Sequence, residues 1–267
     1  MLEALLAAVL GLLIGSFLNV CIYRLPRDLS VLNPPRSFCP ACEKTIAWYD
    51  NLPIASYVML RGQCRQCTET IHWRYPLVEL ITSAAFFAAI LRVGFGLTGL
   101  ELCLLAAILI ELVFSDLEER ILPDEFTIGG VFLGIVMAFW IPRHFGLAQI
   151  LLSALVHNER LLSGLDAAFS AGLCAFVLWG VGALYYRIRG KEGLGFGDVK
   201  MVAMIGAFLG LQGALLTMII GSVMGSVVGI AFILIRKKDM ASYELPFGSF
   251  LGIAAMAVAF WQAGQPR

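Results

Sequence analysis

Long apolar segments constrain what this chain can fold into more than any other feature of its sequence. A helix needs about 20 mostly apolar residues to cross the hydrocarbon core of a bilayer. Segments near this length lie at residues 2–23, 76–93, 97–115, 126–142, 164–186, 199–212, 213–235 and 246–262. The chain is 60% hydrophobic and 14% charged, which is more apolar surface than one soluble core can bury. The sequence therefore predicts an all-α, polytopic integral membrane protein with about eight transmembrane helices.

The basic residues give this arrangement an orientation. With the N-terminus outside, most of the 19 lysine and arginine residues fall in inner loops, and the outer segments keep Arg92, Arg143, Arg160 and Arg267. Cytoplasmic loops of membrane proteins carry such an excess of basic residues. We therefore expect the N-terminus to face out and the long loop after the first span to be cytoplasmic. The 19 acidic residues balance the charge, so nothing points to nucleic acid as a partner.

Four cysteines stand in two C-x-x-C pairs within one polar segment. They are Cys39 and Cys42, then Cys64 and Cys67. Two such pairs at this distance suit four thiolates around one structural Zn²⁺ in a closed site. The alternative is two disulfides or redox-active dithiols, which the reducing cytoplasm disfavours. The spacing therefore predicts a metal that holds the fold and does no chemistry.

The sequence divides into three parts on these grounds. Residues 1–23 form a first transmembrane helix, residues 24–75 a cytoplasmic zinc-binding domain with the four paired cysteines, and residues 76–267 a transmembrane domain. The polar part is small for a core of its own, which is a further reason to expect a metal there. Within the last part, residues 143–163 are typical of a short helix lying at the outer surface.

Two aspartates lie where apolar segments meet the predicted cytoplasmic side. Asp116 ends the third segment and Asp198 begins the sixth, so the topology places both near the same membrane face. Charged residues at membrane depth are costly and are usually functional. Two carboxyl groups in one site can share a proton, so that one activates a water and the other donates to a carbonyl. The pair is therefore a candidate acid–base site.

These acidic residues also have simpler interpretations. Asp198 can be the N-cap of the helix that follows it. Glu118, Glu119 and Asp124 can belong to an ordinary solvated face, and Asp124 suits the cap and first turn of the next span. Gly195 and Gly197, just before Asp198, would let the backbone approach a substrate closely and adopt unusual φ and ψ angles. From the residues alone, both interpretations stay open.

Several motifs in a fixed order give the chain a family resemblance. They are Gly15-Ser-Phe-Leu-Asn-Val20 with Tyr23-Arg-Leu-Pro26, the two C-x-x-C pairs, Arg74-Tyr-Pro-Leu-Val-Glu79-Leu80, Asp116 followed by Leu122-Pro-Asp124, Gly195-Phe-Gly-Asp-Val-Lys200, and Pro246-Phe-Gly248. Over nearly its whole length the chain resembles the type IV prepilin peptidases, which are GxGD intramembrane aspartyl proteases. It departs from them in a long stretch around 143–163 and in Ser249, where proline is usual.

The resemblance implies a bifunctional enzyme of the bacterial inner membrane. Such enzymes cleave the leader of prepilins or pseudopilins after a glycine, and here Asp116 and Asp198 would be catalytic. They then N-methylate the new N-terminal residue with S-adenosylmethionine. This activity serves type IV pili and type II secretion. The sequence shows no residues that we can assign to binding the methyl donor.

Four further residues are implied as motif or supporting positions: Gly195, Gly197, Lys200 and Glu79. Glu79 at the membrane edge can accept the substrate amine or a leader lysine. It can equally be a buried structural partner for an arginine such as Arg74.

Three rival functions remain for the same residues. The G-x-G-D motif also marks proteases that cut other membrane helices, and the substrates that accumulate in a deletion strain would distinguish them. A transporter or scaffold would use the carboxylates to carry protons or bind cations, and it would show proton-coupled flux without proteolysis. In a methyltransferase with a decayed protease motif, labelled S-adenosylmethionine would modify only a pilin that is already cleaved.

Overall fold

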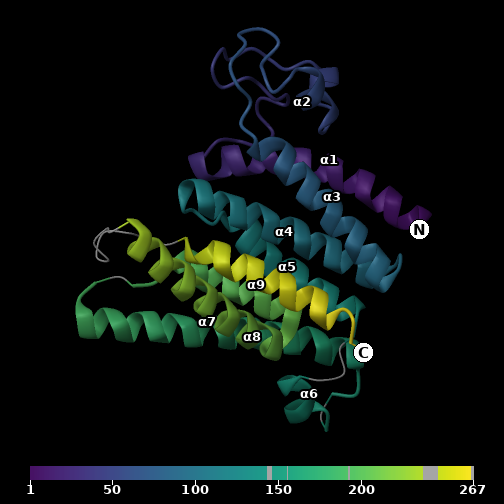
Figure 1. Ribbon diagram of the computed structural model, residues 1–267. Coiled ribbons are helices and arrows are strands. Elements are labelled where there is room, and N and C mark those ends of the chain that lie inside the picture. The colour runs from purple at the N-terminus through teal and green to yellow at the C-terminus, as the bar shows by residue number, and fades with distance from the viewer. Residues whose placement is uncertain (143–145, 155, 192, 237–245, 266–267) are drawn as a thin grey trace. The chain divides into compact units, whose positions relative to one another are not determined.

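A computed structural model describes residues 1–142, 146–154, 156–191, 193–236 and 246–265 (Figure 1). These residues are largely α-helical, and within the described ranges no β-strand forms beyond two isolated bridges. The all-α prediction is therefore confirmed. The chain divides into two compact units, Met1–Glu111 and Leu112–Arg267, with the boundary inside one helix, α4 (Leu97–Glu119). The predicted division at residues 23 and 75 stays a prediction.

Two helices form the frame of the first unit. The unit contains α1 (Leu2–Arg24), the short helices η1 (Leu25–Arg27), η2 (Trp48–Asn51) and α2 (Ala55–Met59), and α3 (Arg74–Val93), with the start of α4. A Cβ at Gly11 or Gly15 would lie 2.7 Å from a backbone Cα of α3, and the Ser83 hydroxyl donates to the Ala8 carbonyl. This G-x-x-x-G spacing lets the backbones of α1 and α3 touch, as small residues do between membrane helices.

The second unit is a bundle around its longest helix. It contains the end of α4, α5 (Asp124–Trp140), α6 (Leu147–Leu152), α7 (Glu159–Arg189), α8 (Phe196–Arg236) and α9 (Phe247–Gln262), and α8 packs against α5, α7 and α9. Gly210 breaks α8 into two helices because its backbone is non-helical, with φ 69° and ψ 178°. The sequence predicts this break at Gln212-Gly213. The residue with the left-handed φ is the earlier glycine, a conformation that costs glycine little.

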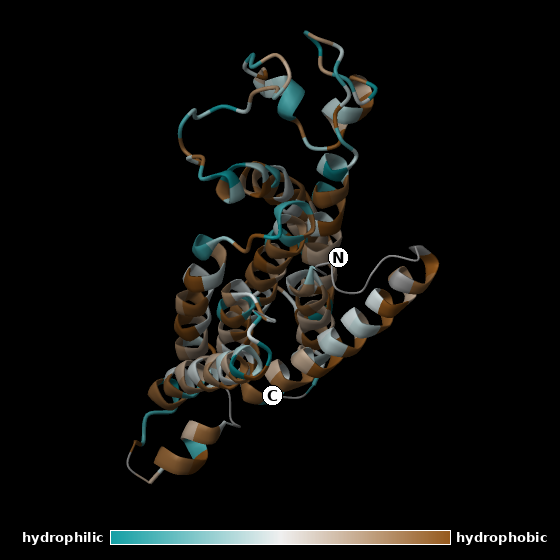
Figure 2. Ribbon diagram, turned by 90° about the vertical axis from the view of Figure 1, so that its left-hand side faces the viewer, coloured by the Kyte–Doolittle hydropathy of each residue, from teal (hydrophilic) through white to brown (hydrophobic). Residues whose placement is uncertain are grey.

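Hydropathy follows the helices, with apolar residues along the long helices and polar residues concentrated in the loops (Figure 2). Among the described residues, five helical segments are long and apolar enough to cross a membrane: Leu2–Arg27, Arg74–Val93, Leu97–Glu119, Glu159–Arg189 and Phe196–Phe232. Helix α9 is apolar but has 16 residues. A polytopic membrane fold follows, while the count of eight spans stays a prediction.

A short helix does lie within the segment 143–163, although residues 143–145 and 155 fall outside the described part of the chain. Helix α6 packs on α7, where buried Asp166 accepts a hydrogen bond from the Ala148 N–H at 3.0 Å. Asn158 caps α7 by accepting from the N–H groups of Arg160 and Leu161. The long stretch between the two aspartates thus contains a short helix anchored on α7, and its position relative to a membrane stays a prediction.

Candidate catalytic and metal-binding sites

Asp116 lies in the last turns of α4 and is almost fully buried, with 6% of its surface exposed. Its Oδ2 accepts two hydrogen bonds from Ser249, one from the backbone N–H at 2.6 Å and one from the hydroxyl at 2.7 Å. Ser249 stands in the first turn of α9, whose N–H groups have no partners within the helix. The carboxylate of Asp116 therefore caps the positive end of α9.

Asp198 lies in the first turn of α8 and is half-buried. Its N–H donates to the Gly195 carbonyl at 3.2 Å, and the helix begins at Phe196. Asp198 is therefore a first-turn residue and not the N-cap. The two carboxyl groups lie close enough for Asp116 to act electrostatically on Asp198. The structure thus brings together the two aspartates that the sequence places on one membrane face.

Two glycines make room for Leu122 beside this pair. A Cβ at Gly197 would lie 3.3 Å from the Leu122 side chain, and one at Gly248 would lie 3.1 Å from it and 3.2 Å from the Asp116 carboxyl. Neither glycine of the G-x-G-D motif has a positive φ. Neither therefore has the left-handed backbone that favours glycine. Gly197 serves close packing against Leu122, and a Cβ at Gly195 would lie 3.3 Å from Oδ2 of Asp198.

A salt bridge joins the starts of α8 and α5. Lys200 pairs with Asp124, and its ammonium also lies 5.5 Å from the centre of the Phe196 ring. Asp124 is the first residue of α5, and Pro123 is the N-cap. Lys200, two residues after Asp198, therefore ties the G-x-G-D turn to the neighbouring helix and does not point freely into water.

The cysteines of the first unit form two hairpins of one design. In each, the N–H of the first cysteine donates to the carbonyl five residues later, and a β-bridge closes the turn, Phe38 with Thr45 and Gln63 with Thr70. The residue after the second cysteine has a left-handed φ of 57° in both, at Glu43 and Thr68. The two pairs are therefore a structural repeat, although the sequence shows no repeat beyond the cysteine spacing.

The four sulfur atoms converge as a metal site requires. All four Sγ atoms lie within 4.8 Å of one another, and those of Cys39 and Cys67 are 3.7 Å apart. Two ligands at tetrahedral corners, each about 2.3 Å from a Zn²⁺, are separated by about 3.8 Å. The N–H groups of Gln66 and Cys67 lower the pKa of Cys64 to about 7, whereas desolvation and the neighbouring cysteines raise the pKa of Cys67 to about 12. Cys64 is thus the cysteine that most readily gives the thiolate that binds metal. The donor set fits a closed four-thiolate metal site.

Glu79 occupies a different place from the aspartates, in α3 of the first unit. It is 8% exposed, and its Oε2 accepts a hydrogen bond of 2.8 Å from the Ile54 N–H. Ile54 has φ 60°, which is a strained conformation for a β-branched residue. The sequence gives no sign of this contact, because it joins an irregular loop to a helix 25 residues later.

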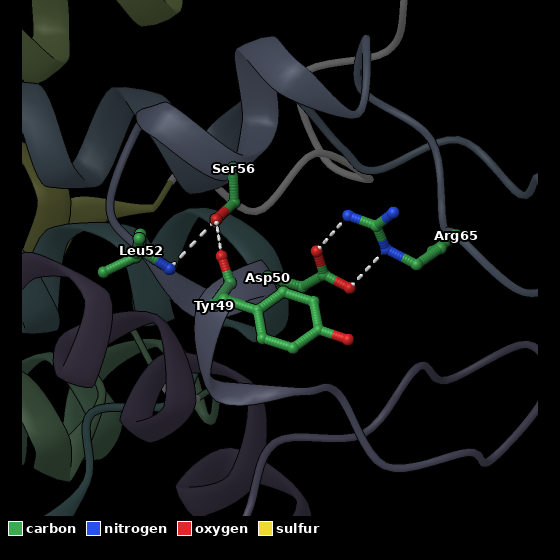
Figure 3. Close-up of polar contacts among 5 residues, drawn as sticks. All are labelled: Tyr49, Asp50, Leu52, Ser56 and Arg65. Carbon is green, nitrogen blue, oxygen red and sulfur yellow. Dashed lines mark hydrogen bonds and ion pairs between the residues drawn. The ribbon is translucent and has the colours of Figure 1, made fainter.

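The loop that carries Ile54 is braced by side chains (Figure 3). The Arg65 guanidinium donates to both Asp50 oxygens, at 2.8 and 2.6 Å, and holds the pKa of Asp50 below its usual value. The Ser56 hydroxyl donates to the Tyr49 carbonyl at 2.8 Å and accepts from the Leu52 N–H at 3.0 Å. These contacts fix the loop that presents its N–H to Glu79.

Comparisons with known proteins show the family of the chain. Residues 9–93 match the family model of the bacterial peptidase A24 N-terminal domain, and residues 103–230 match that of the type IV leader peptidase family. A Xanthomonas campestris protein named prepilin leader peptidase/N-methyltransferase is 34% identical over 277 residues, covering 96% of this chain and 90% of that protein. Proteins of the same name from Myxococcus xanthus and Pseudomonas aeruginosa are 36% and 33% identical, covering 97% and 94% of this chain and 71% and 88% of theirs. No solved structure matches the chain.

Proposed function

The chain belongs to the type IV leader peptidase family, and from that premise we propose that Asp116 and Asp198 are the catalytic pair with which it removes prepilin leaders. It is a multi-pass inner-membrane enzyme with peptidase and N-methyltransferase activities. Its substrates are prepilins or pseudopilins, and both activities act on the same polypeptide, first at the leader and then at the new N-terminus.

One observation carries the assignment of the catalytic pair. The carboxyl groups of Asp116 in α4 and Asp198 in α8 are near enough for the charge of one to act on the other, and Asp116 accepts hydrogen bonds from both donors of Ser249. Donors aimed at a carboxylate stabilise its charge, so Asp116 fits the base that takes a proton from water. Asp198, beside that charge, fits the acid that donates to the scissile carbonyl. Gly195 and Gly197 place Asp198, and Lys200 holds its turn on α5.

The membrane setting explains why this pair sits at helix ends. We propose that the N-terminus faces out, so that the aspartates and the cysteine hairpins share the cytoplasmic side. The substrate's apolar N-terminal helix then docks in the bilayer while its basic leader stays in the cytoplasm, and the scissile bond after the leader glycine meets the aspartates at the membrane surface. Tagging the termini and the 24–75 loop for accessibility to a membrane-impermeant label tests this orientation.

We propose zinc as the metal of the four cysteines. Four thiolates leave no open position for a water or substrate, so the ion stabilises the hairpins and takes no part in peptide cleavage. Metal analysis of the purified protein should give one zinc per chain, and a folded preparation that contains no zinc would contradict the proposal.

Cleavage of a co-expressed prepilin tests the catalytic pair. We expect Asp116→Asn and Asp198→Asn each to lower leader removal by about 100- to 10,000-fold at equal membrane levels, because each removes one partner of acid–base catalysis. Asp166→Asn is the matched control, since Asp166 is also a buried hydrogen-bonded aspartate of the second unit and Asn keeps its acceptor. Cleavage surviving in either catalytic variant would make that residue structural.

A further inference from the structure

The short helix α2 of the first unit presents an apolar face that no described part of the chain covers. Ala55, Val58 and Met59 are three and four residues apart, so they share one side of the helix, and all three are exposed. Val58 is 67% exposed and Met59 76%. Residues 51–60 contain no charged side chain, although they belong to the polar loop 24–75. An apolar surface in such a setting usually marks a place of contact with a partner or a membrane.

The opposite side of α2 is held by the fold. The Ser56 hydroxyl joins the Tyr49 carbonyl to the Leu52 N–H (Figure 3). Ser56, Tyr57 and Leu60 also line a cavity of about 590 Å³ within the first unit. Because these contacts fix which side of α2 faces the unit, Val58 and Met59 face away from it.

A hydrogen bond to α3 sets the depth of α2 in the membrane. The 20 residues of α3 extend over about 30 Å, which equals the thickness of the hydrocarbon core, so the first turn of α3 lies at its edge. Ile54, the residue before α2, donates its N–H to Glu79 in the second turn of α3. Helical side chains lean toward the N-terminus, which brings the Glu79 carboxylate to the level of the first turn. Helix α2 therefore begins where acyl chains meet headgroups.

The neighbours of α2 have the chemistry of a membrane surface. Trp73, the N-cap of α3, is 63% exposed, and tryptophan is enriched where membranes meet water. Leu80 follows Glu79 directly and is 52% exposed, so the lipid-facing surface of α3 begins at the same level. Arg61, two residues after α2, is exposed and has the charge that headgroup phosphates attract.

We propose that α2 is a membrane-surface anchor. Its face of Ala55, Val58 and Met59 lies between the headgroups and the acyl chains of the leaflet in which α1 ends and α3 begins, and Arg61 contacts lipid phosphate. Amphipathic helices bind membrane surfaces in this way. The anchor fastens the loop 24–75 to the bilayer between its two spans, so that the cysteine hairpins on either side of α2 stay at the membrane surface.

The apolar helix of a pilin is the other candidate for this face. The Ile54–Glu79 bond favours lipid, because it holds α2 at the edge of the bilayer in the protein by itself, without a substrate. Lipid is then the first apolar material that Val58 and Met59 meet.

Oxidation of Met59 in the wild-type protein tests the burial of this face. The full-length, metal-loaded protein is placed in nanodiscs of equal amounts of phosphatidylcholine and phosphatidylglycerol and treated with hydrogen peroxide. Met59 should form its sulfoxide at least about fivefold more slowly than in the unfolded protein, as peptide mass spectrometry measures, because lipid shields the sulfur. Oxidation at the unfolded rate would overturn the proposal, and so would protection that appears only when a prepilin is added.

Cross-linking identifies what covers the face. Phosphatidylcholine with a diazirine in its acyl chain should label the wild-type peptide that contains residues 55–59 when the nanodiscs are illuminated. A peptide without lipid label, in nanodiscs whose spans are labelled, would overturn the proposal.

A charge on the face should release it from the bilayer. We expect Val58→Asp to raise the rate of Met59 oxidation in nanodiscs by at least about threefold, because a carboxylate is costly below the headgroups. Leu32→Asp is the matched control, since Leu32 is 83% exposed in the same loop but lies outside α2, and it should leave Met59 protected. Retained metal shows that each variant is folded. Undiminished protection of Met59 in metal-loaded Val58→Asp would overturn the proposal.

Discussion

The two units build their sites in opposite ways. In the first, each cysteine hairpin is local, since its hydrogen bonds and bridge close within ten residues and are repeated in the second hairpin. In the second unit, the carboxylate of Asp116 depends on Ser249, 133 residues away in the chain. Local sites are stabilised by their ligand and by turn geometry, whereas assembled sites depend on helix packing. The two should therefore respond differently to the same kind of change.

Removing a metal ligand should give the largest effect and confine it to the first unit. Structural zinc contributes about 10–16 kcal/mol in small zinc-folded peptides, and the hairpins have little other core. We expect Cys64→Ser to lose the metal and to expose residues 37–72 to limited proteolysis. The apolar helices of the second unit should stay resistant to the same protease.

Cys103→Ala provides the control for this loss. Cys103 is a buried cysteine of α4 outside the four-sulfur cluster, so its replacement should leave the metal content unchanged. If Cys64→Ser retained its metal in full, the hairpins would not depend on four thiolates. The claim that the site of the first unit is stabilised by its metal would then be wrong.

Removing one donor from the aspartate site should give an intermediate effect. Ser249→Ala deletes the hydroxyl but keeps the backbone N–H that bonds Asp116. A hydrogen bond to a charged group contributes about 1.5–3 kcal/mol, which corresponds to a loss of about 10- to 100-fold in the rate of leader cleavage. Single-turnover cleavage should show this loss with little change in prepilin affinity, and an unchanged rate would mean that the hydroxyl is dispensable.

Proline is the residue that the family resemblance leads us to expect at position 249. Proline has neither an N–H nor a hydroxyl, so it offers Asp116 none of the hydrogen bonds that Ser249 supplies. Ser249→Pro should therefore fall below Ser249→Ala in cleavage rate. A rate above that of the alanine variant would show that helix geometry, and not the donors, sets the reactivity of Asp116.

The contrast between the units also explains which parts the sequence predicts. The spacing of the cysteines suffices for the metal site because the hairpins are local, and topology suffices to place Asp116 near Asp198. In the sequence, Ser249 stands out only as a departure from the family motif. Nothing in the sequence around Asp116 predicts that Ser249 is its hydrogen-bond partner. The Glu79–Ile54 bond depends equally on packing between segments. Distant pairings of this kind leave no periodic or spacing signal.

A smaller effect should come from the strained turns of the cysteine hairpins. Thr68 has φ 57°, and left-handed backbone costs about 1–2 kcal/mol outside glycine. Thr68→Gly should therefore slow metal loss to a chelator. We expect a factor of about three, because the greater flexibility of glycine in the unfolded chain cancels part of the stabilisation gained by removing the strain. Glu43→Gly, at the matching position of the other hairpin, should gain less because glutamate is not β-branched. Faster metal loss from Thr68→Gly would show that its hydroxyl, which bonds the Cys67 carbonyl, matters more than strain.

The smallest effect should come from the salt bridge beside the aspartates. Lys200 keeps 21% of its side chain exposed and Asp124 58%, and ion pairs this accessible contribute about 0.2–1 kcal/mol. We expect Lys200→Gln and Asp124→Asn each to lower cleavage by about two- to fivefold, with the double variant no worse than either single one, because all three lose the same contact. Additive losses would mean that the two side chains act separately. If Lys200→Gln lowered the rate of leader cleavage as much as Asp198→Asn, the lysine would take part in the reaction itself. The site of the second unit would then contain three reacting groups, Asp116, Asp198 and Lys200, and the role of Lys200 would not be limited to its salt bridge with Asp124.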